Sequence, residues 1–472
     1  MSPILIILTG MIVVLIAIMV IRLHPILALL TGALVVGLLT SPYLLEQYAA
    51  SKSFSPEQVR SLLNQSIGER ITKGFGNTCE RVGLLILLAS FTGKCLLQSG
   101  AAERIVRSLT NVFGERNTPV SFMISSFILA IPTFFEAVFY LMVPLARVMG
   151  VRKPKLFPVL IMAIVAAAAM AGGLVPPAPG PLFATTTLGV NIGLAIIMGS
   201  IIGLVCTGVG LLYAYWVNRR QDIIMRTTTD ADLEEMKQWM NKSTAELPSF
   251  FLSILPILVP VILITGRAVI TNSHTAMPEV IANFFMHAGD PTIALFIATC
   301  IALIILARQS GYRLKELKKP MDEAVFSAGT IILIIAAGGA FGAMIQQTAI
   351  GDWLINLTPD LKLAVLPLAF FISAVIRTAQ GSATVAMITA VGILSAFNTP
   401  GALGFHPVYL AAVIGCGAKV FPWMNDAGFW IVCRMSGFTE KETFRNFSMV
   451  LIVMGFTGLL VTMLLAKLFP LV

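Results

Sequence analysis

Three ionisable side chains stand inside long apolar stretches of this sequence, close to residues that interrupt a helix. Asp426 lies four residues after Pro422 in the stretch KVFPWMNDAGFW. Glu136 lies four residues after Pro132 in IPTFFEAVF, and Arg377 lies in IRTAQGSATVA. A charge at the centre of a bilayer costs about 2.5 to 3.5 kcal/mol on insertion scales, so such a residue marks a functional site by default. These stretches are therefore where we expect chemistry.

The stretch KVFPWMNDAGFW is predicted to unwind a helix. Pro422 has no backbone N–H, so it frees a carbonyl in the preceding turn to act as a ligand. A carboxyl at this depth favours its protonated form, and we expect Asp426 to take up and release a proton. Asn425 is expected to contact a hydroxyl of the substrate. The alternative is an ion pair between Asp426 and Lys419 that only fixes the kink.

Glu136 is the second candidate proton carrier. Its apolar segment, residues 120–146, contains no Lys or Arg. The alternative is that Glu136 only stabilises the helix that follows Pro132, because acidic residues favour the first turn of a helix. Either interpretation puts a carboxyl group beside a break.

The stretch IRTAQGSATVA is typical of a hairpin tip with a glycine turn. Arg377 offers a guanidinium suited to a bidentate hold on a carboxylate, and the helix that starts at about Ser382 adds partial positive charge. The residues expected to contact the substrate around this turn are Thr378, Gln380, Gly381, Ser382 and Thr384. An anion with several hydroxyls fits this set. The alternative is that Arg377 snorkels or pairs with a nearby acid.

A second helix break is predicted at GGLVPPAPGP, residues 172–181, in a run without any charged residue. Its glycines and prolines cannot continue a helix, so we expect exposed amides and carbonyls, and we include Pro177 and Gly180 among the substrate-binding candidates. The three threonines at 185–187 are expected near the start of the resumed helix, where they would cap it or bind substrate.

The elements that hold these residues are predicted to be membrane-spanning helices. Of 472 residues, 57% are apolar and 12% are charged, against roughly 25% charged in soluble domains. The apolar runs have the length of about 17 to 25 residues that crosses a hydrocarbon core. The first run, near residues 3–21, is expected to be a helix and not a cleaved signal peptide. The composition indicates an all-α polytopic membrane protein.

Other classes of protein are disfavoured. The net charge of +9 comes from Lys and Arg in short loops between apolar runs, so nucleic-acid binding is not expected. The cysteines and histidines are too scattered for a metal site, and we expect no metal or other cofactor. No HExxH or GxSxG motif supports an enzyme.

The positions of the positive charges predict the topology. Helices are expected near 3–21, 25–44, 80–98, 250–270, 291–307, 325–343 and 447–468, with broken helices near 157–187 and 407–433. Segments 119–146 and 363–397 are expected to be re-entrant hairpins, the first entering from the cytoplasm and the second from outside.

The two halves are predicted to be inverted repeats. Residues 1–217 and 250–472 share the order of three helices, a hairpin, a broken helix and a closing helix, joined by a cytoplasmic linker at 218–249 that includes a helical DADLEEMKQWM. Faint similarity at an offset of about 245 to 250 residues agrees, as between SFTGKCLLQSGAAERI and GAFGAMIQQTAIGDWL. Such repeats with interrupted helices are typical of secondary transporters, which bind substrate where the interruptions meet.

The strings RTAQGSATVA, NDAGFW and FGNTCERVGLLILLASFTGKCLLQSGAAERI resemble those of the gluconate permease (GntP) family of bacterial proton-coupled sugar-acid transporters. The resemblance covers nearly the whole chain. It implies an elevator-type mechanism, a homodimer, a place in the cytoplasmic (inner) membrane, and substrate or coupling roles for Gln380, Ser382, Thr384, Asn425 and Asp426.

Three departures from the family pattern fall at the predicted site. The family usually has Asp in place of Glu136, His in place of Ala178, and Ser-His in place of Pro422-Trp423.

The architecture, the candidate residues and the family resemblance together predict a symporter. We expect it to import gluconate or a related small hydroxy-carboxylate with protons across the lipid bilayer. The alternatives are sodium coupling in the same fold, and another small acid such as glycerate or D-serine. A channel is less favoured, because gated hairpins suit alternating access.

Overall fold

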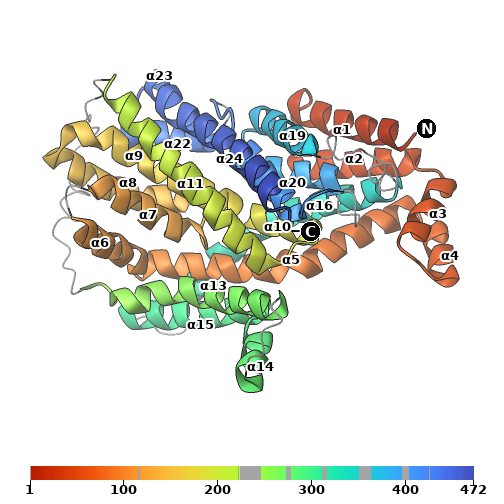
Figure 1. Ribbon diagram of the computed structural model, residues 1–472, viewed down its shortest axis with the longest axis horizontal. Coiled ribbons are helices and arrows are strands. Elements are labelled where there is room, and N and C mark those ends of the chain that lie inside the picture. The colour runs from red at the N-terminus through yellow and green to blue at the C-terminus, as the bar shows by residue number, and fades with distance from the viewer. Residues whose placement is uncertain are drawn as a thin grey trace.

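The chain folds into a bundle of helices, which the figures show as a computed structural model (Figure 1). Residues 2–114, 117–221, 223, 246–272, 278–310, 316–349, 363–395, 403–424 and 426–471 are described. Every regular element in them is a helix, as the composition predicts. The linker helix expected at 230–240 lies outside these residues.

Long helices form the frame of the molecule. They are α1 (Pro3–Met19), α2 (Pro25–Leu39), α5 (Ile67–Gln98), α11 (Ile192–Asn218), α13 (Phe250–Asn272), α15 (Pro291–Ser310), α16 (Lys318–Gln346) and α24 (Met449–Leu468). Six helices of the described part are long and apolar enough to cross a membrane, or up to 8 if two bent pairs each count as one span. The expectation of several membrane-spanning helices is confirmed.

Helix α5 is much longer than the predicted segment 80–98, because a capping box starts it early. The Ser66 hydroxyl accepts from the Glu69 amide at 3.2 Å, and the Glu69 carboxylate accepts from the Ser66 amide at 2.7 Å. Such caps satisfy amides that have no partner within the helix. Hydropathy does not detect this charged first part of the helix.

Helices α5 and α16 pack against each other along much of their length (Figure 1). Their backbones approach closely at Gly74, where an added β-carbon would lie 2.9 Å from the β-carbon of Ala343. Helix α15 packs on α5 and α13 packs on α15, whereas α2 packs on α16. This frame borders the elements that carry the predicted site.

The predicted site elements are helices that are joined in pairs by a break. They form four pairs: α7 (Thr118–Ala130) with α8 (Phe135–Arg152), α9 (Phe157–Leu174) with α10 (Pro179–Thr187), α19 (Val365–Gln380) with α20 (Ala383–Leu394), and α21 (Pro407–Gly417) with α22 (Ala427–Ser436). Each break contains Pro or Gly, as expected of residues that end a helix.

One local prediction is wrong. Thr185, Thr186 and Thr187 end α10 instead of beginning it. The Thr185 hydroxyl donates to the Pro181 carbonyl at 2.6 Å and the Thr186 hydroxyl donates to the Leu182 carbonyl at 3.0 Å. The helix resumes at Pro179 because a proline fits the first position of a helix, which is earlier than the predicted threonine start.

Short helices outside the frame were not predicted. They are α3 (Pro42–Ser51), α4 (Pro56–Asn64), α6 (Ala101–Phe113), α14 (Glu279–Ala288) and α23 (Glu440–Thr443). The predicted helix 25–44 ends at Leu39, since Pro42 begins α3. These elements are too short or too polar for a hydropathy pattern to separate them from loops.

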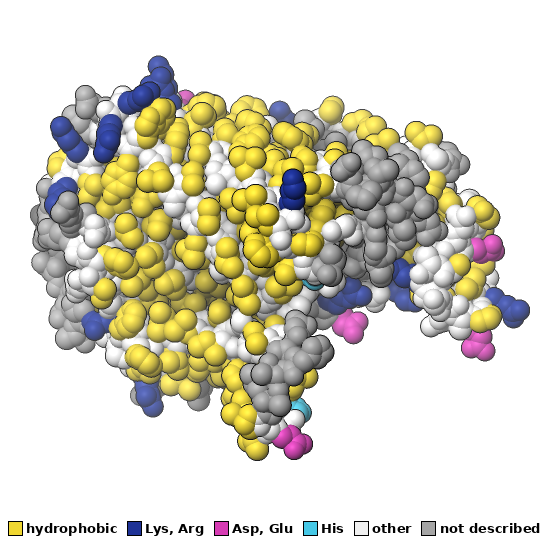
Figure 2. Space-filling model, viewed as in Figure 1, with side chains coloured by type: hydrophobic (Ala, Val, Ile, Leu, Met, Phe, Trp, Pro, Cys, Tyr) yellow, Lys and Arg dark blue, Asp and Glu magenta, His cyan; other side chains and the backbone are white. Residues whose placement is uncertain are grey.

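Among the candidate membrane spans, the one formed by α9 and α10 is the most enclosed, with 94% of its apolar stretch buried inside the protein. Its outer face is apolar, with hydrophobic side chains over most of the surface in view and Lys and Arg mostly toward the two ends (Figure 2). Apolar surface on this scale is what a lipid-facing protein shows. Helix α9, which ends at one of the predicted breaks, therefore lies inside the bundle.

Candidate functional site

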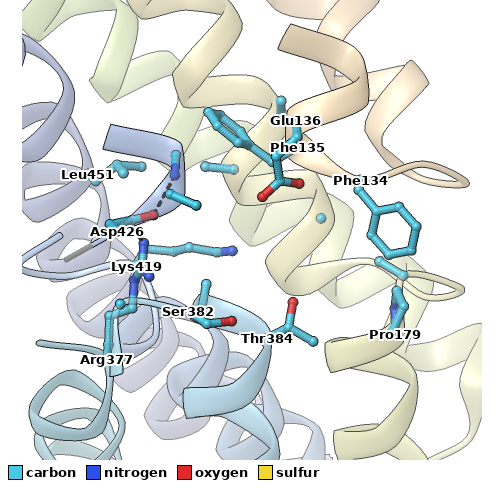
Figure 3. Close-up of a pocket in the computed structure, with 18 of the residues that line it drawn as sticks. Phe134, Phe135, Glu136, Pro179, Arg377, Ser382, Thr384, Lys419, Asp426 and Leu451 are labelled. Carbon is cyan, nitrogen blue, oxygen red and sulfur yellow. Dashed lines mark hydrogen bonds and ion pairs between the residues drawn. The ribbon is translucent and has the colours of Figure 1, made fainter. Parts of the chain in front are cut away.

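A cavity of about 150 Å³ lies where the four breaks meet (Figure 3). Residues at the start of α8, α10, α20 and α22 all line it. A helix N-terminus carries roughly half a positive charge. Three of these termini also offer backbone N–H groups, whereas Pro179 and Pro181 leave few of them at the start of α10. Four such termini around one cavity form a site suited to an anion.

Arg377 and Asp426 form a buried ion pair at one wall of this cavity. Each residue is 5% exposed. The Arg377 guanidinium donates to one carboxylate oxygen of Asp426, and the other oxygen accepts from the Gly428 amide at 2.7 Å, so that Asp426 caps α22. The alternative in which Arg377 pairs with a nearby acid is therefore what the structure shows.

Lys419 is the other cation of the cavity, and it does not pair with Asp426 as the sequence alternative proposed. Its side chain points into the cavity (Figure 3), it is 9% exposed, and none of its described neighbours forms a hydrogen bond or an ion pair with it. Gly173 leaves the room that it occupies, because an added β-carbon there would overlap the Lys419 side chain. The sequence did not predict that Lys419 faces a substrate cavity.

Glu136 lies in the first turn of α8 and points into the same space as Lys419 (Figure 3). Its side chain forms no capping hydrogen bond, and the residue is exposed. In the described part of the chain its carboxylate accepts no hydrogen bond. Its place in the first turn fits the alternative that Glu136 stabilises α8, while its exposure leaves the carboxylate accessible to water and ligands.

Hydroxyl groups line the side of the cavity formed by α20. Ser382 and Thr384 both border it, with Gly381 at the turn between them and α19. The Ser382 hydroxyl accepts from the Val385 amide at 3.4 Å, which caps α20. Gly381 has a φ of 73°, a left-handed conformation that favours glycine. The predicted hairpin tip thus brings donors and a helix N-terminus to the cavity.

Other predicted residues lie away from the cavity or cannot be placed. Thr378 donates its hydroxyl to the Ala374 carbonyl at 2.8 Å. Pro177 borders a different, smaller pocket, and Gly180 packs toward Met387, so at this break the lining residues are Ala178 and Pro179. Asn425 and the side chain of Gln380 lie outside the described part.

Trp423, one of the departures from the family pattern, holds the unwound stretch in place instead of lining the cavity. Its indole N–H donates to the Thr378 carbonyl at 2.8 Å, and the Trp430 indole N–H donates to the Met424 carbonyl at 2.6 Å. Both bonds satisfy carbonyls near helix ends. The first bond ties the stretch that carries Lys419 and Asp426 to the end of α19, and the second ties it to α22.

The other lining residues are mostly small and apolar. They are Thr133, Phe134, Phe135, Ala168, Ala169, Gly172, Ala383, Ala427, Gly428, Phe447 and Leu451. Among the residues that the structure describes, no group of three or more His, Cys, Asp or Glu side chains is placed to hold a metal ion. The chemistry available here is ion pairing, hydrogen bonding and proton exchange.

A helical protein with many apolar spans and an ionisable cavity enclosed at broken helices belongs to the membrane transporters. A family model described as GntP family permease matches residues 57–469. The chain therefore belongs to the GntP permease family, as the sequence resemblance predicts, and it is a multi-pass membrane permease.

Known relatives agree with this assignment along most of their length. The chain is 31% identical over 407 residues to a gluconate permease of Pseudomonas aeruginosa. This matched region covers 84% of this chain and 88% of the relative. It is 29% identical over 402 residues to the Gnt-II system L-idonate transporter of Escherichia coli, with coverage of 84% and 88%. It is 28% identical over 410 residues to the high-affinity gluconate transporter of the same species, with coverage of 85% and 90%.

The fold is also similar to that of the YdaH transporter of Alcanivorax borkumensis, whose crystal structure is described as having an unusual topology. The TM-score is 0.60 at 14% sequence identity, over 95% of this chain and 100% of the other. At this identity the likeness concerns the fold alone.

Proposed function

We propose that this permease imports gluconate or a related small hydroxy-carboxylate together with protons. The observation that carries the proposal is the cavity at which four helix N-termini meet two cations, Arg377 and Lys419, and two acids, Glu136 and Asp426. The helix ends and cations suit a carboxylate. The acids suit proton coupling, because an intramembrane carboxyl group changes its charge when it binds a proton.

The polar groups of the hairpin tip are proposed to select hydroxyls. Ser382 and Thr384 line the cavity and are substrate-binding candidates, together with Gly381 at the turn. Gln380 and Asn425 stay candidates from the sequence. Thr378, Pro177 and Gly180 are proposed to act on the breaks that shape the cavity, because they do not border it. The names of the relatives, which refer to gluconate and to L-idonate, support a sugar acid.

An elevator-type mechanism is proposed for the movement of substrate. The four helix pairs joined by breaks would move as one body against the frame, with residues 1–217 and 250–472 as inverted repeats and 218–249 as the linker between them. The place of action is proposed to be the bacterial inner membrane, and the assembly a homodimer.

Uptake into proteoliposomes tests this function. Labelled gluconate, other aldonates, glycerate and D-serine are each offered with a proton gradient, a sodium gradient, or neither. Accumulation of a hydroxy acid with the proton gradient alone is the expected result. Accumulation that needs sodium would favour the coupling alternative, and uptake of none of these acids would refute the proposed substrate class.

A further inference from the structure

The two cations of the cavity are not equivalent. Arg377 is already neutralised, since its guanidinium donates to Asp426 in a pair that is 5% exposed on both sides. Lys419 is 9% exposed and keeps its ammonium without a hydrogen bond or an ion pair to the described residues around it. A buried ammonium in this state needs an anionic partner.

The surroundings of Lys419 leave space for such a partner. The side chain extends from the unwound stretch after α21 past the backbone of α9, where Gly173 has no β-carbon to block it. Its end reaches the part of the cavity that Glu136, Ser382 and Thr384 also face (Figure 3). A carboxylate at this point would meet the ammonium, and the hydroxyls of the same molecule would face α20.

The charges around the cavity explain why a proton would enter with the acid. The charged groups facing it are Glu136 from α8, Arg377 from α19, Lys419 from the stretch after α21 and Asp426 at the start of α22. The lining residues of α9, α10, α20 and α24 are uncharged, and Cys416 of α21 is the other titratable group close to Lys419. Two positive and two negative charges balance, so a substrate carboxylate would leave one negative charge in excess.

Glu136 is the acid placed to remove that excess. Both oxygens of Asp426 are engaged, one by Arg377 and one by the Gly428 amide. Glu136 is exposed and accepts no hydrogen bond from the described chain, so water can deliver a proton to it. Without substrate, the Glu136 carboxylate is the negative charge that faces the same space as the Lys419 ammonium (Figure 3).

We propose that the Lys419 ammonium binds the carboxylate of the substrate, and that Glu136 takes up the proton that enters with the acid. The substrate carboxylate then replaces the Glu136 carboxylate as the negative charge that faces Lys419. This inference rests on the proposed function, and it assigns the carboxylate to Lys419 instead of Arg377. Lys419 stays an ammonium throughout. The proton passes from water to a carboxyl oxygen of Glu136, and it returns to water when the acid leaves.

The test is the kinetics of Lys419→Met in proteoliposomes, with the panel acid that the wild-type chain accumulates as substrate. A charged hydrogen bond is worth about 1.5–3 kcal/mol, so KM should rise about tenfold or more, with Vmax changed less. Lys419→Arg should recover part of that loss. The matched control is Lys467→Met, which removes an exposed lysine at the end of α24 and should leave KM unchanged.

Gly173→Ala provides a second route that keeps every charge in place. Its methyl group would displace the Lys419 ammonium, so KM for the acid should also rise. Gly208→Ala is the control, because a β-carbon at Gly208 of α11 would meet nothing within 4 Å.

The comparison of an acid with its uncharged amide separates a charge effect from a general packing effect. Wild-type uptake should be inhibited far better by gluconate than by gluconamide, and Lys419→Met should lose most of that preference. If Lys419→Met and Gly173→Ala both retain the wild-type KM and this preference, the assignment of Lys419 is wrong although the proposed function stands. If the wild-type chain accumulates no acid, the proposed function fails and the assignment fails with it.

Discussion

At the scale of single residues, the cavity assigns different tasks to two carboxyl groups that look alike in the sequence. Asp426 is held by an ion pair and a helix cap, whereas Glu136 is exposed and has no such partner among the described residues. A group that must gain and lose a proton needs access to water. Of the two acids considered for proton coupling, we therefore propose Glu136 as the group that carries the proton and Asp426 as the structural partner of Arg377.

Glu136→Gln should uncouple transport from the proton gradient without abolishing substrate exchange. An amide cannot take up a proton, so accumulation driven by the gradient should fall to the background level. Counterflow of labelled against unlabelled substrate should persist and depend little on pH, because Lys419 then has no competing charge. Loss of counterflow in a variant that still elutes as a single species would contradict this role.

Arg377 and Asp426 should depend on each other for stability. Removal of one partner of a buried ion pair typically costs about 3–5 kcal/mol, because the other charge is left unpaired. Arg377→Met or Asp426→Asn alone should therefore lower the unfolding temperature more than the double variant does. The control is Lys94→Met, since Lys94 and Glu323 pair at 2.5 Å on a surface where they are 29% and 48% exposed, and such a pair is worth about 1 kcal/mol or less. Equal losses at both sites would contradict the prediction.

Sequence reasoning located most of the charged residues of the site and left open that Arg377 pairs with an acid, but it did not identify Asp426 as that acid. Asp426, Glu136 and Arg377 were predictable, because a charge in an apolar run is costly and conspicuous. The partner of Asp426 was not, since Lys419 is near in sequence while Arg377 comes from another helix. Contacts across such a separation depend on how the helices pack, which one sequence does not reveal.

At the scale of elements, the breaks are what turn helices into a binding site. Proline and glycine predict where α7, α9, α19 and α21 stop. They are less reliable for where the helix resumes: the start of α20 next to Ser382 agrees with the prediction, whereas the threonines of α10 were misplaced. The charged start of α5 was missed because hydropathy does not detect it. The cavity depends on the resumed helices, because their N-termini surround it.

Gly381→Ala should destabilise the hairpin tip. Gly381 has a φ of 73°, and the left-handed conformation costs a residue with a β-carbon roughly 1–2 kcal/mol. The variant should unfold at a lower temperature and bind substrate more weakly. Gly76→Ala is the control on α5, where a β-carbon would meet nothing within 4 Å and alanine favours the helix. An unchanged unfolding temperature for Gly381→Ala would show that the turn can relax.

At the scale of the whole molecule, composition predicted an all-helical membrane protein with several spans, and the structure confirms it. The short helices outside the frame escaped prediction, because they lack the length or the hydropathy of a span. The proposed elevator movement requires the hairpin of α19 and α20 to slide along the frame.

A cross-link between α20 and α16 should stop transport if that movement occurs. The Ser395 hydroxyl donates to the Gly342 carbonyl at 3.2 Å, and a β-carbon at Gly342 would lie 3.2 Å from the Ser395 oxygen. Ser395→Cys with Gly342→Cys, in a background without the native cysteines, should lose uptake on oxidation and regain it on reduction. Each single variant is a control for the cysteine itself. Full uptake by completely cross-linked protein would refute movement of α20 against α16.

Uptake driven by pH alone is the measurement closest to the central proposal, that one carboxylate enters this cavity with one proton. One negative and one positive charge make an electrically neutral load. Labelled gluconate should therefore accumulate in proteoliposomes when the outside is acidic and the membrane potential is held at zero, and a potential imposed without a pH gradient should drive none. Accumulation that follows the membrane potential or sodium, with no response to pH, would contradict the proposal that Glu136 is protonated when the substrate carboxylate binds.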